Sequence, residues 1–335
     1  MQDCRKLLCY LASIPLGVAI SPTIQAQVVG GEWKTVLQID AGFSIDGIGA
    51  SPESLVSMGD INGDGFADIA VGIRAVFSPR GKVHFVSGLD GSEILPFLEP
   101  GGTKFGVSLD AEDFNQDGIL DLLVGDPGAK KVFIFSGLDR SQLYEVSDTQ
   151  NSSFGSSVSV VGDQNTDQVP DFVVGAPEFW PGGSVFVYSG SDGTLLYQID
   201  APGLSTTANF GASVSGLKDV DGDGVDEILI GAPGSSNGEV YVYSGSNQQP
   251  LHSPVVGGVL NQEFGAMVAE CGDIDGDQAG DFIVGAYKSG LNRMNSVGAA
   301  YIYSGGRGNL LLRKLDGEDE VNHFGWTVAA AGDLN

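Results

Sequence analysis

Nine consecutive residues, Asp219 to Glu227, read DVDGDGVDE and carry acidic side chains at positions 1, 3, 5 and 9. The backbone carbonyl of Val225 falls at position 7. Hard oxygen ligands at this spacing suit calcium, which takes about six to eight oxygens at about 2.3–2.6 Å. Magnesium prefers a tight octahedron with several waters, and the loop lacks the thiolates and imidazoles that zinc or copper would favour. The spacing therefore predicts a calcium site.

The same pattern occurs in four other complete copies, and a sixth begins at Asp333. Oxygen-bearing side chains occupy positions 1, 3, 5 and 9 in every complete copy: Asp60, Asn62, Asp64 and Asp68; Asp113, Asn115, Asp117 and Asp121; Asp163, Asn165, Asp167 and Asp171; Asp219, Asp221, Asp223 and Glu227; and Asp273, Asp275, Asp277 and Asp281. The alternative is that these runs are polar turns, in which Asp and Gly are common. Two carboxylates ~4 Å apart repel by ~4 kcal/mol at an effective dielectric of ~20, against a typical domain stability of ~5–15 kcal/mol. Repeated clusters therefore favour metal binding.

The composition indicates a folded, acidic protein. The 335 residues include 42% hydrophobic residues and have a formal net charge of −27, from 43 acidic and 16 basic residues. This charge opposes binding to nucleic acid or to anionic membrane surfaces. Much of the acidity lies in the repeated loops, so we interpret it as a metal signature.

The N-terminus has the three regions of a secretory signal peptide. Arg5 and Lys6 precede an apolar run from Leu7 to Ile20, and a small residue stands at Ala26. We expect residues 1–26 to be removed and residues 27–335 to form one exported domain, located outside the cell, at the cell surface or in a periplasm. No later stretch is long and apolar enough to cross a bilayer. Cys271 would then be the one remaining cysteine, and its apolar neighbours predict a buried side chain.

The loops recur every 50 to 60 residues and are flanked by strand-like segments. A Phe-Gly pair and an alternating stretch precede each loop, as in FGASVSGLKD from Phe210, and a short apolar run ending in Gly follows it. A third alternating run ends in Ser-Gly, and a fourth strand closes the repeat. Four short strands with glycine-rich turns predict an all-β fold, a β-propeller of four-stranded antiparallel blades.

The Phe-Gly pair, the acidic loop and Gly-Ala-Pro together resemble the FG-GAP repeat of the integrin α-subunit N-terminal β-propeller. Two stretches carry this resemblance almost completely, Phe210 to Pro233 and Phe154 to Pro177. The resemblance implies a parent propeller of seven blades and calcium in about five loops here. It also implies that the position 7 carbonyls join the ligand sets: Phe66, Ile119, Val169, Val225 and Ala279.

Two loops depart from the family pattern at position 6. Gln168 and Gln278 stand where the other loops have Gly, which takes a positive φ at little cost, and Pro170 is a further oddity in the third loop. We therefore predict weaker calcium binding by residues 163–171 and 273–281. Asp226, at position 8 of the fourth loop, is expected to point to solvent.

Five blades can be completed, and we expect each to take its outermost strand from the start of the following repeat. This leaves over the strand near Trp33 to Asp40 and the one from Phe324 to Gly332, with the sixth loop cut at Asn335. Either the sequence is a fragment of a longer propeller or another chain completes the last blade. We favour the fragment, because an open sheet edge otherwise remains.

No catalytic constellation emerges: there are three histidines, His84, His252 and His323, and no Gly-x-Ser-x-Gly motif. The resemblance implies a non-catalytic binding module whose variable rim contacts an extracellular protein or polysaccharide. The alternative is an accessory propeller of a secreted hydrolase, or a lectin. Phe179 and Trp180 can stack on a sugar or partner, although packing on their own blade is the simpler expectation.

Overall fold

The computed structural model describes the backbone of residues 8–10, 23–27 and 33–38. It also describes residues 55–73, 80–100, 102–149, 153–203, 205–258, 263–290, 297–317 and 323–330. Most of the predicted signal peptide and the start of the sixth loop lie outside these residues. Those that are described contain strands and turns but no helix, and so no helix long and apolar enough to span a membrane.

Five sheets of four consecutive antiparallel strands form the blades. The first contains β4 (Leu55–Gly59), β5 (Asp68–Ile73), β6 (Lys82–Val86) and β7 (Glu93–Leu98). The second contains β8 (Ser108–Glu112), β9 (Asp121–Asp126), β10 (Lys131–Phe135) and β11 (Gln142–Ser147). The third contains β12 (Ser157–Val161), β13 (Asp171–Ala176), β14 (Ser184–Tyr188) and β15 (Leu195–Asp200). The fourth contains β16 (Ser213–Leu217), β17 (Glu227–Ala232), β18 (Glu239–Tyr243) and β19 (Val255–Val256), and the fifth β20 (Met267–Gly272), β21 (Asp281–Ala286), β22 (Ala299–Ser304) and β23 (Leu310–Asp316).

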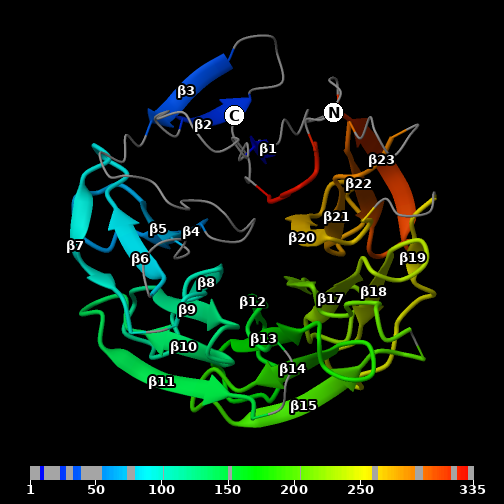
Figure 1. Cartoon of the computed structure of the whole chain (residues 1–335), viewed down its shortest axis with the longest axis horizontal. Coiled ribbons are helices and arrows are strands. Elements are labelled where there is room, and N and C mark those ends of the chain that lie inside the picture. Colours follow the sequence, from blue (N-terminus) through cyan, green and yellow to red (C-terminus); the bar gives the residue numbers. More distant parts are fainter. Residues whose placement is uncertain are drawn as a thin grey trace.

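The blades are arranged around an axis, with the first strand of each blade innermost and the fourth outermost (Figure 1). A separate three-stranded sheet, β1 (Leu8–Tyr10), β2 (Thr23–Gln27) and β3 (Trp33–Gln38), is drawn between the first and fifth blades. The predicted propeller of four-stranded antiparallel blades is therefore confirmed.

The predicted exchange of outer strands between repeats is wrong. The outermost strand of every blade is the fourth strand of its own repeat, because the turn after each third strand is short enough to continue the antiparallel meander. The strand expected near Trp33 pairs with β2, and the described residues after Phe324 form turns with one bridge, between Gly298 and Phe324.

The core consists of layers between neighbouring blades, and the Phe-Gly pairs anchor them. Phe105, Phe154, Phe210 and Phe264 are at most 1% exposed. Each ring lies edge-on against a third-strand aromatic ring of its own blade, with centroids 5.5–5.6 Å apart. It also joins a cluster with second- or third-strand residues of the preceding blade. All six residues of β9, β13, β17 and β21 are buried, as predicted for the second strands.

The glycine at the last but one position of each second strand allows neighbouring blades to approach. A Cβ on Gly231 would lie 2.1 Å from the carbonyl oxygen of Gly265, the Phe-Gly glycine of the next blade. Such a contact is impossible for any other residue without a backbone shift. The two glycines of the repeat motif therefore set the distance between blades, and hence the positions of the acidic loops.

Candidate metal centre

The five acidic loops, residues 60–68, 113–121, 163–171, 219–227 and 273–281, each connect the first and second strands of a blade. In an antiparallel meander this edge also carries the turn between the third and fourth strands. All five loops therefore lie on one rim, as the sequence predicts.

Both ends of each loop are fixed by hydrogen bonds from its own backbone. The position 1 carboxylate accepts from amides further along the loop: in the first loop, Asp60 accepts from Gly63, Asp64 and Gly65 at 2.7–3.0 Å. The position 9 carboxylate is fully buried at the start of the second strand, and in the same loop Asp68 accepts from the amide of Ile61 at 3.0 Å. The chain therefore curls around the space between the two carboxylates.

The Ser-Gly pair that ends each third strand supplies a contact that sequence reasoning missed. The glycine amide donates to the position 9 carboxylate in four blades, from Gly88, Gly137, Gly190 and Gly305 at 2.9–3.3 Å. The serine hydroxyl of Ser87, Ser189 or Ser304 donates to the position 5 carboxylate at 3.0–3.3 Å. The recurrence of Ser-Gly was the signal that could have revealed these residues.

The fourth loop gathers all four of its acidic side chains. Asp219, Asp221, Asp223 and Glu227 each offer an oxygen, and these atoms lie within 4.8 Å of one another. Oxygens at this separation can all touch one ion at about 2.4 Å, the calcium distance. Glu227 is 0% exposed, and its Oε1 has no hydrogen-bond partner. The donor set thus fits a hard divalent cation.

Burial also changes the acidity of Glu227. Its removal from water raises the pKa of the carboxyl group to about 8, and the neighbouring loop carboxylates add to the effect by repulsion. At neutral pH and without a cation, this side chain therefore favours the protonated form. A bound divalent ion would favour the charged form instead.

The fifth loop gathers three carboxylates, Asp273, Asp275 and Asp281, within the same 4.8 Å limit. Its position 5 residue, Asp277, lies beside an arginine: Arg307 Nε is 3.4 Å from Asp277 Oδ2. Arg307 also approaches Asp275, with its Nη1 3.4 Å from Asp275 Oδ2.

The first three loops have Asn at position 3 and form no such group of three acidic side chains within the described residues. In the first loop, Asn62 Nδ2 donates to Asp64 Oδ2 at 2.9 Å and to Asp68 Oδ1 at 3.5 Å. Asn115 makes the equivalent two contacts in the second loop, and Asn165 makes the first of them in the third. An amide NH₂ group therefore lies among the carboxylates where the fourth loop has another acid.

Position 6 takes the predicted backbone conformation in every loop. Gly65, Gly118 and Gly224 have φ of 87° to 89°, and Gln168 and Gln278 take φ of 70° and 76°. The two glutamines therefore adopt a conformation that side chains with a Cβ disfavour. At position 7 the amides of all five residues donate to the position 5 carboxylate at 2.9–3.1 Å.

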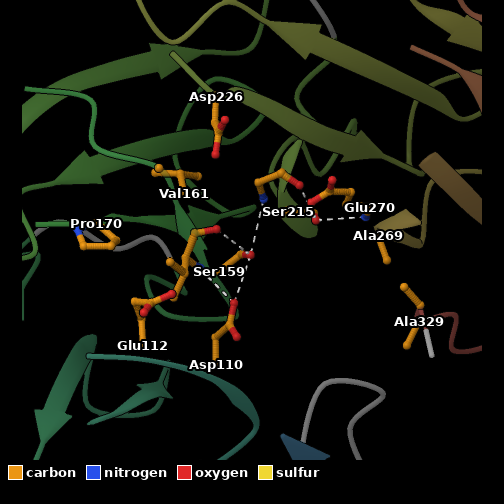
Figure 2. A pocket seen from close by; sticks show the side chains of 14 residues that line it. Asp110, Glu112, Ser159, Val161, Pro170, Ser215, Asp226, Ala269, Glu270 and Ala329 are labelled. Atoms are coloured by element: carbon orange, nitrogen blue, oxygen red, sulfur yellow. Dashed lines mark hydrogen bonds between the residues drawn. The ribbon is translucent and has the colours of Figure 1, made fainter. Parts of the chain in front are cut away.

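A second group of acidic residues comes from the inner strands β8 and β20 and from the fourth loop. A cavity of about 370 Å³ is lined by Asp110, Glu112, Asp226 and Glu270, among others (Figure 2). Asp110 accepts from the amide of Val160 at 2.8 Å and from the Ser159 hydroxyl at 3.1 Å, which ties two blades together. The expectation that Asp226 points to solvent is wrong: it is half-buried beside the neighbouring blade, and its Oδ1 accepts from the Asp219 amide at 3.2 Å.

The other residues singled out in the sequence lie outside the acidic loops. The imidazole of His84 is stacked on Phe97, with centroids 5.1 Å apart, and contacts Glu93. Cys271 is buried, as expected. Of the two aromatic residues in the third blade, Phe179 packs edge-on against Phe186, whereas Trp180 is 75% exposed.

Comparisons with known proteins agree with the repeat architecture. A family model described as FG-GAP repeat matches residues 54–85, 105–141 and 210–243. The chain is 36% identical over 174 residues to integrin alpha-PS5 of Drosophila melanogaster, covering 46% of this chain and 17% of that protein. It is 31% identical over 210 residues to integrin alpha-5 of Xenopus laevis, covering 55% of this chain and 20% of that protein. The chain thus spans at most about a fifth of the length of these curated relatives.

Proposed function

We propose that this chain, an FG-GAP repeat protein similar to integrin alpha subunits, is a secreted calcium-binding propeller that acts as a non-catalytic binding module. Calcium makes one rim rigid. The other rim, which carries the turns between second and third strands and between blades, contacts an extracellular protein or polysaccharide. The exposed Trp180 lies in one of those turns.

The observation that carries calcium binding is the fully buried Glu227, whose Oε1 has no partner among four convergent carboxylates. A buried charged oxygen without a partner is costly, and a divalent cation removes both that cost and the repulsion between the acids. We propose the side-chain oxygens at positions 1, 3, 5 and 9, with the position 7 carbonyls, as the ligands in all five loops.

The test is a calcium titration by calorimetry, with the position 1 Asp of each loop changed to Ala in turn. At a calcium concentration 100 times the Kd, each site should contribute about 2.7 kcal/mol to the free energy of unfolding. Asp219→Ala should remove the tightest site, and Asp163→Ala and Asp273→Ala should remove weaker ones. Equal losses at all loops would contradict this ranking.

Measuring the metal content of the purified protein tests calcium binding itself, independently of the order of affinity among the loops. Purified protein that contains no alkaline-earth metal, and whose melting temperature is the same in EDTA and in calcium, would overturn calcium binding altogether. What supports the proposed non-catalytic role is the similarity to integrin alpha subunits.

A further inference from the structure

The turn between β22 and β23 places a cation against the fifth acidic loop. Arg307 reaches Asp275 and Asp277, at 3.4 Å from an oxygen of each. The Arg307 side chain is 51% exposed, whereas Asp275 and Asp277 are 10% and 15% exposed. The carboxylates are thus held in the loop, while the guanidinium is free to leave it for solvent.

The equivalent position in the other blades never carries a positive charge. The second residue after the Ser-Gly pair is Asp90, Asp139, Asp192, Asn247 and Arg307 in the five blades. Asp90, Asp139 and Asp192 accept from the amide two residues later at 2.8–2.9 Å, a local turn contact. The second residue after the Ser-Gly pair is therefore negatively charged beside the first three loops, uncharged beside the fourth and positively charged beside the fifth.

The residue before Arg307 makes this approach possible. A Cβ on Gly306 would lie 2.9 Å from Asp277 Oδ2 and 2.8 Å from Ala279 Cβ. The third and fourth blades have Ser191 and Ser246 there, whose hydroxyls donate to the position 5 carboxylate at 2.8 and 2.5 Å. In the fifth blade that hydroxyl is missing, and Arg307 Nε lies beside Asp277 instead.

Arg307 offsets part of the negative charge of the fifth loop but does not complete the hydrogen bonding of its carboxylates. Asp275 Oδ2 has no hydrogen-bond partner, and its ion pair with Arg307 is longer than a charge-assisted hydrogen bond of about 2.7–2.9 Å. Calcium would bind the same oxygens at about 2.3–2.6 Å. Because a guanidinium and a divalent ion cannot share these oxygens at close range, the two cations must compete.

We propose that Arg307 is a built-in counter-ion of the fifth loop, which competes with calcium for Asp275 and Asp277 and is displaced to solvent when the metal binds. This inference rests on the proposed calcium binding. Competition by Arg307 makes the fifth site fill at a higher calcium concentration than the fourth. When calcium is low, the same arginine keeps the fifth blade stable.

The experiment compares Arg307→Gln with Arg313→Gln, an exposed arginine on β23 of the same blade, by calcium calorimetry in an Asp219→Ala background. Arg307→Gln should tighten calcium binding to the fifth loop about three- to tenfold, equivalent to about 0.7–1.4 kcal/mol. Arg313→Gln should leave it unchanged. The converse variant, Asn247→Arg in the otherwise unaltered chain, should weaken the fourth site by a similar factor.

Melting temperature distinguishes competition from a merely structural role. Arg307→Gln should melt lower than the parent in EDTA and no lower in saturating calcium. Equal losses in both conditions, or unchanged calcium affinity, would overturn the competition while leaving calcium binding intact. No calcium binding by the unsubstituted chain would overturn the proposed function, and this inference with it.

Discussion

The first and fourth acidic loops have the same length and the same anchoring, but they balance charge differently. In the first loop the NH₂ group of Asn62 lies between Asp64 and Asp68, and Asp68 also accepts from the Gly88 amide at 3.1 Å. In the fourth loop Asp221 replaces the amide, and Glu227 Oε1 has no partner. The protein itself supplies hydrogen-bond partners to the first loop, whereas the fourth loop keeps a buried carboxylate oxygen without a partner, where the proposed cation would bind.

One methylene group accounts for part of this difference. An Asp at position 9 accepts the Ser-Gly amide in four blades, whereas Oε1 of the longer Glu227 in the remaining blade has no hydrogen-bond partner. Dependence on metal should therefore be unequal around the ring and greatest at the fourth loop.

The largest effect should be a pH dependence that exists only without calcium. Because the folded pKa of Glu227 is about 8, above its ordinary value of 4.5, the folded state binds the proton more tightly than the unfolded state. The stability contributed by this proton is complete below pH 4.5 and lost as the pH rises through 8. Asp171, with a pKa raised to about 6 by burial, acts in the same direction at lower pH. Glu227 should therefore reduce the free energy of unfolding by about 2.3 kcal/mol between pH 6 and 8.

Urea denaturation in EDTA at several pH values measures this loss, and Glu227→Gln serves as the comparison. The variant should show little loss of stability between pH 6 and 8, and saturating calcium should abolish most of the loss in the unsubstituted protein. An equally steep loss in Glu227→Gln would assign the effect to other groups and remove the contrast between the loops.

Exchanging the position 3 residues of the first and fourth loops should make the stability and calcium affinity of each loop more like those of the other. Asn62→Asp adds a charge to the first loop and removes its bridging amide, so stability in EDTA should fall by about 1–2 kcal/mol while calcium binds more tightly. Asp221→Asn should raise stability in EDTA and weaken calcium binding at the fourth loop. Denaturation and calorimetry on both variants measure the exchange, and changes of the same sign in both would show that position 3 does not set the difference.

Much of this architecture can be predicted from local sequence, because the same features recur in each repeat. The Phe-Gly pairs, the fully apolar second strands and the spacing of the loop acids predict the blades and the rim on which the acids lie. The sequence does not assign the outermost strands correctly, since four strand-like segments in a row do not show where one sheet stops. The pairing of each fourth strand with its own third strand settles that point.

The contacts that distinguish one loop from another could not be predicted in this way. The Ser-Gly amides and Arg307 come from a turn more than 15 residues after each loop begins, and their reach depends on how that turn folds back. The position of Asp226 in the fourth loop predicts a side chain that points to solvent, yet the neighbouring blade half-covers it. These features arise from packing between elements, which a single loop sequence does not contain.

The smallest effect concerns position 6, where the third and fifth loops differ from the fourth. Gln168 and Gln278 hold φ of 70° and 76°, a conformation that costs a residue with a Cβ about 1–2 kcal/mol. Replacing either with Gly removes this strain but adds flexibility to the unfolded chain, so Gln278→Gly and Gln168→Gly should each gain about 0.5–1 kcal/mol in denaturation experiments. The reverse change, Gly224→Gln, should cost the fourth loop a similar amount and weaken its calcium binding. If the glycine variants gained stability but not calcium affinity, the weaker binding expected of these two loops would have to come from their charges, and for the fifth loop from Arg307, rather than from backbone strain.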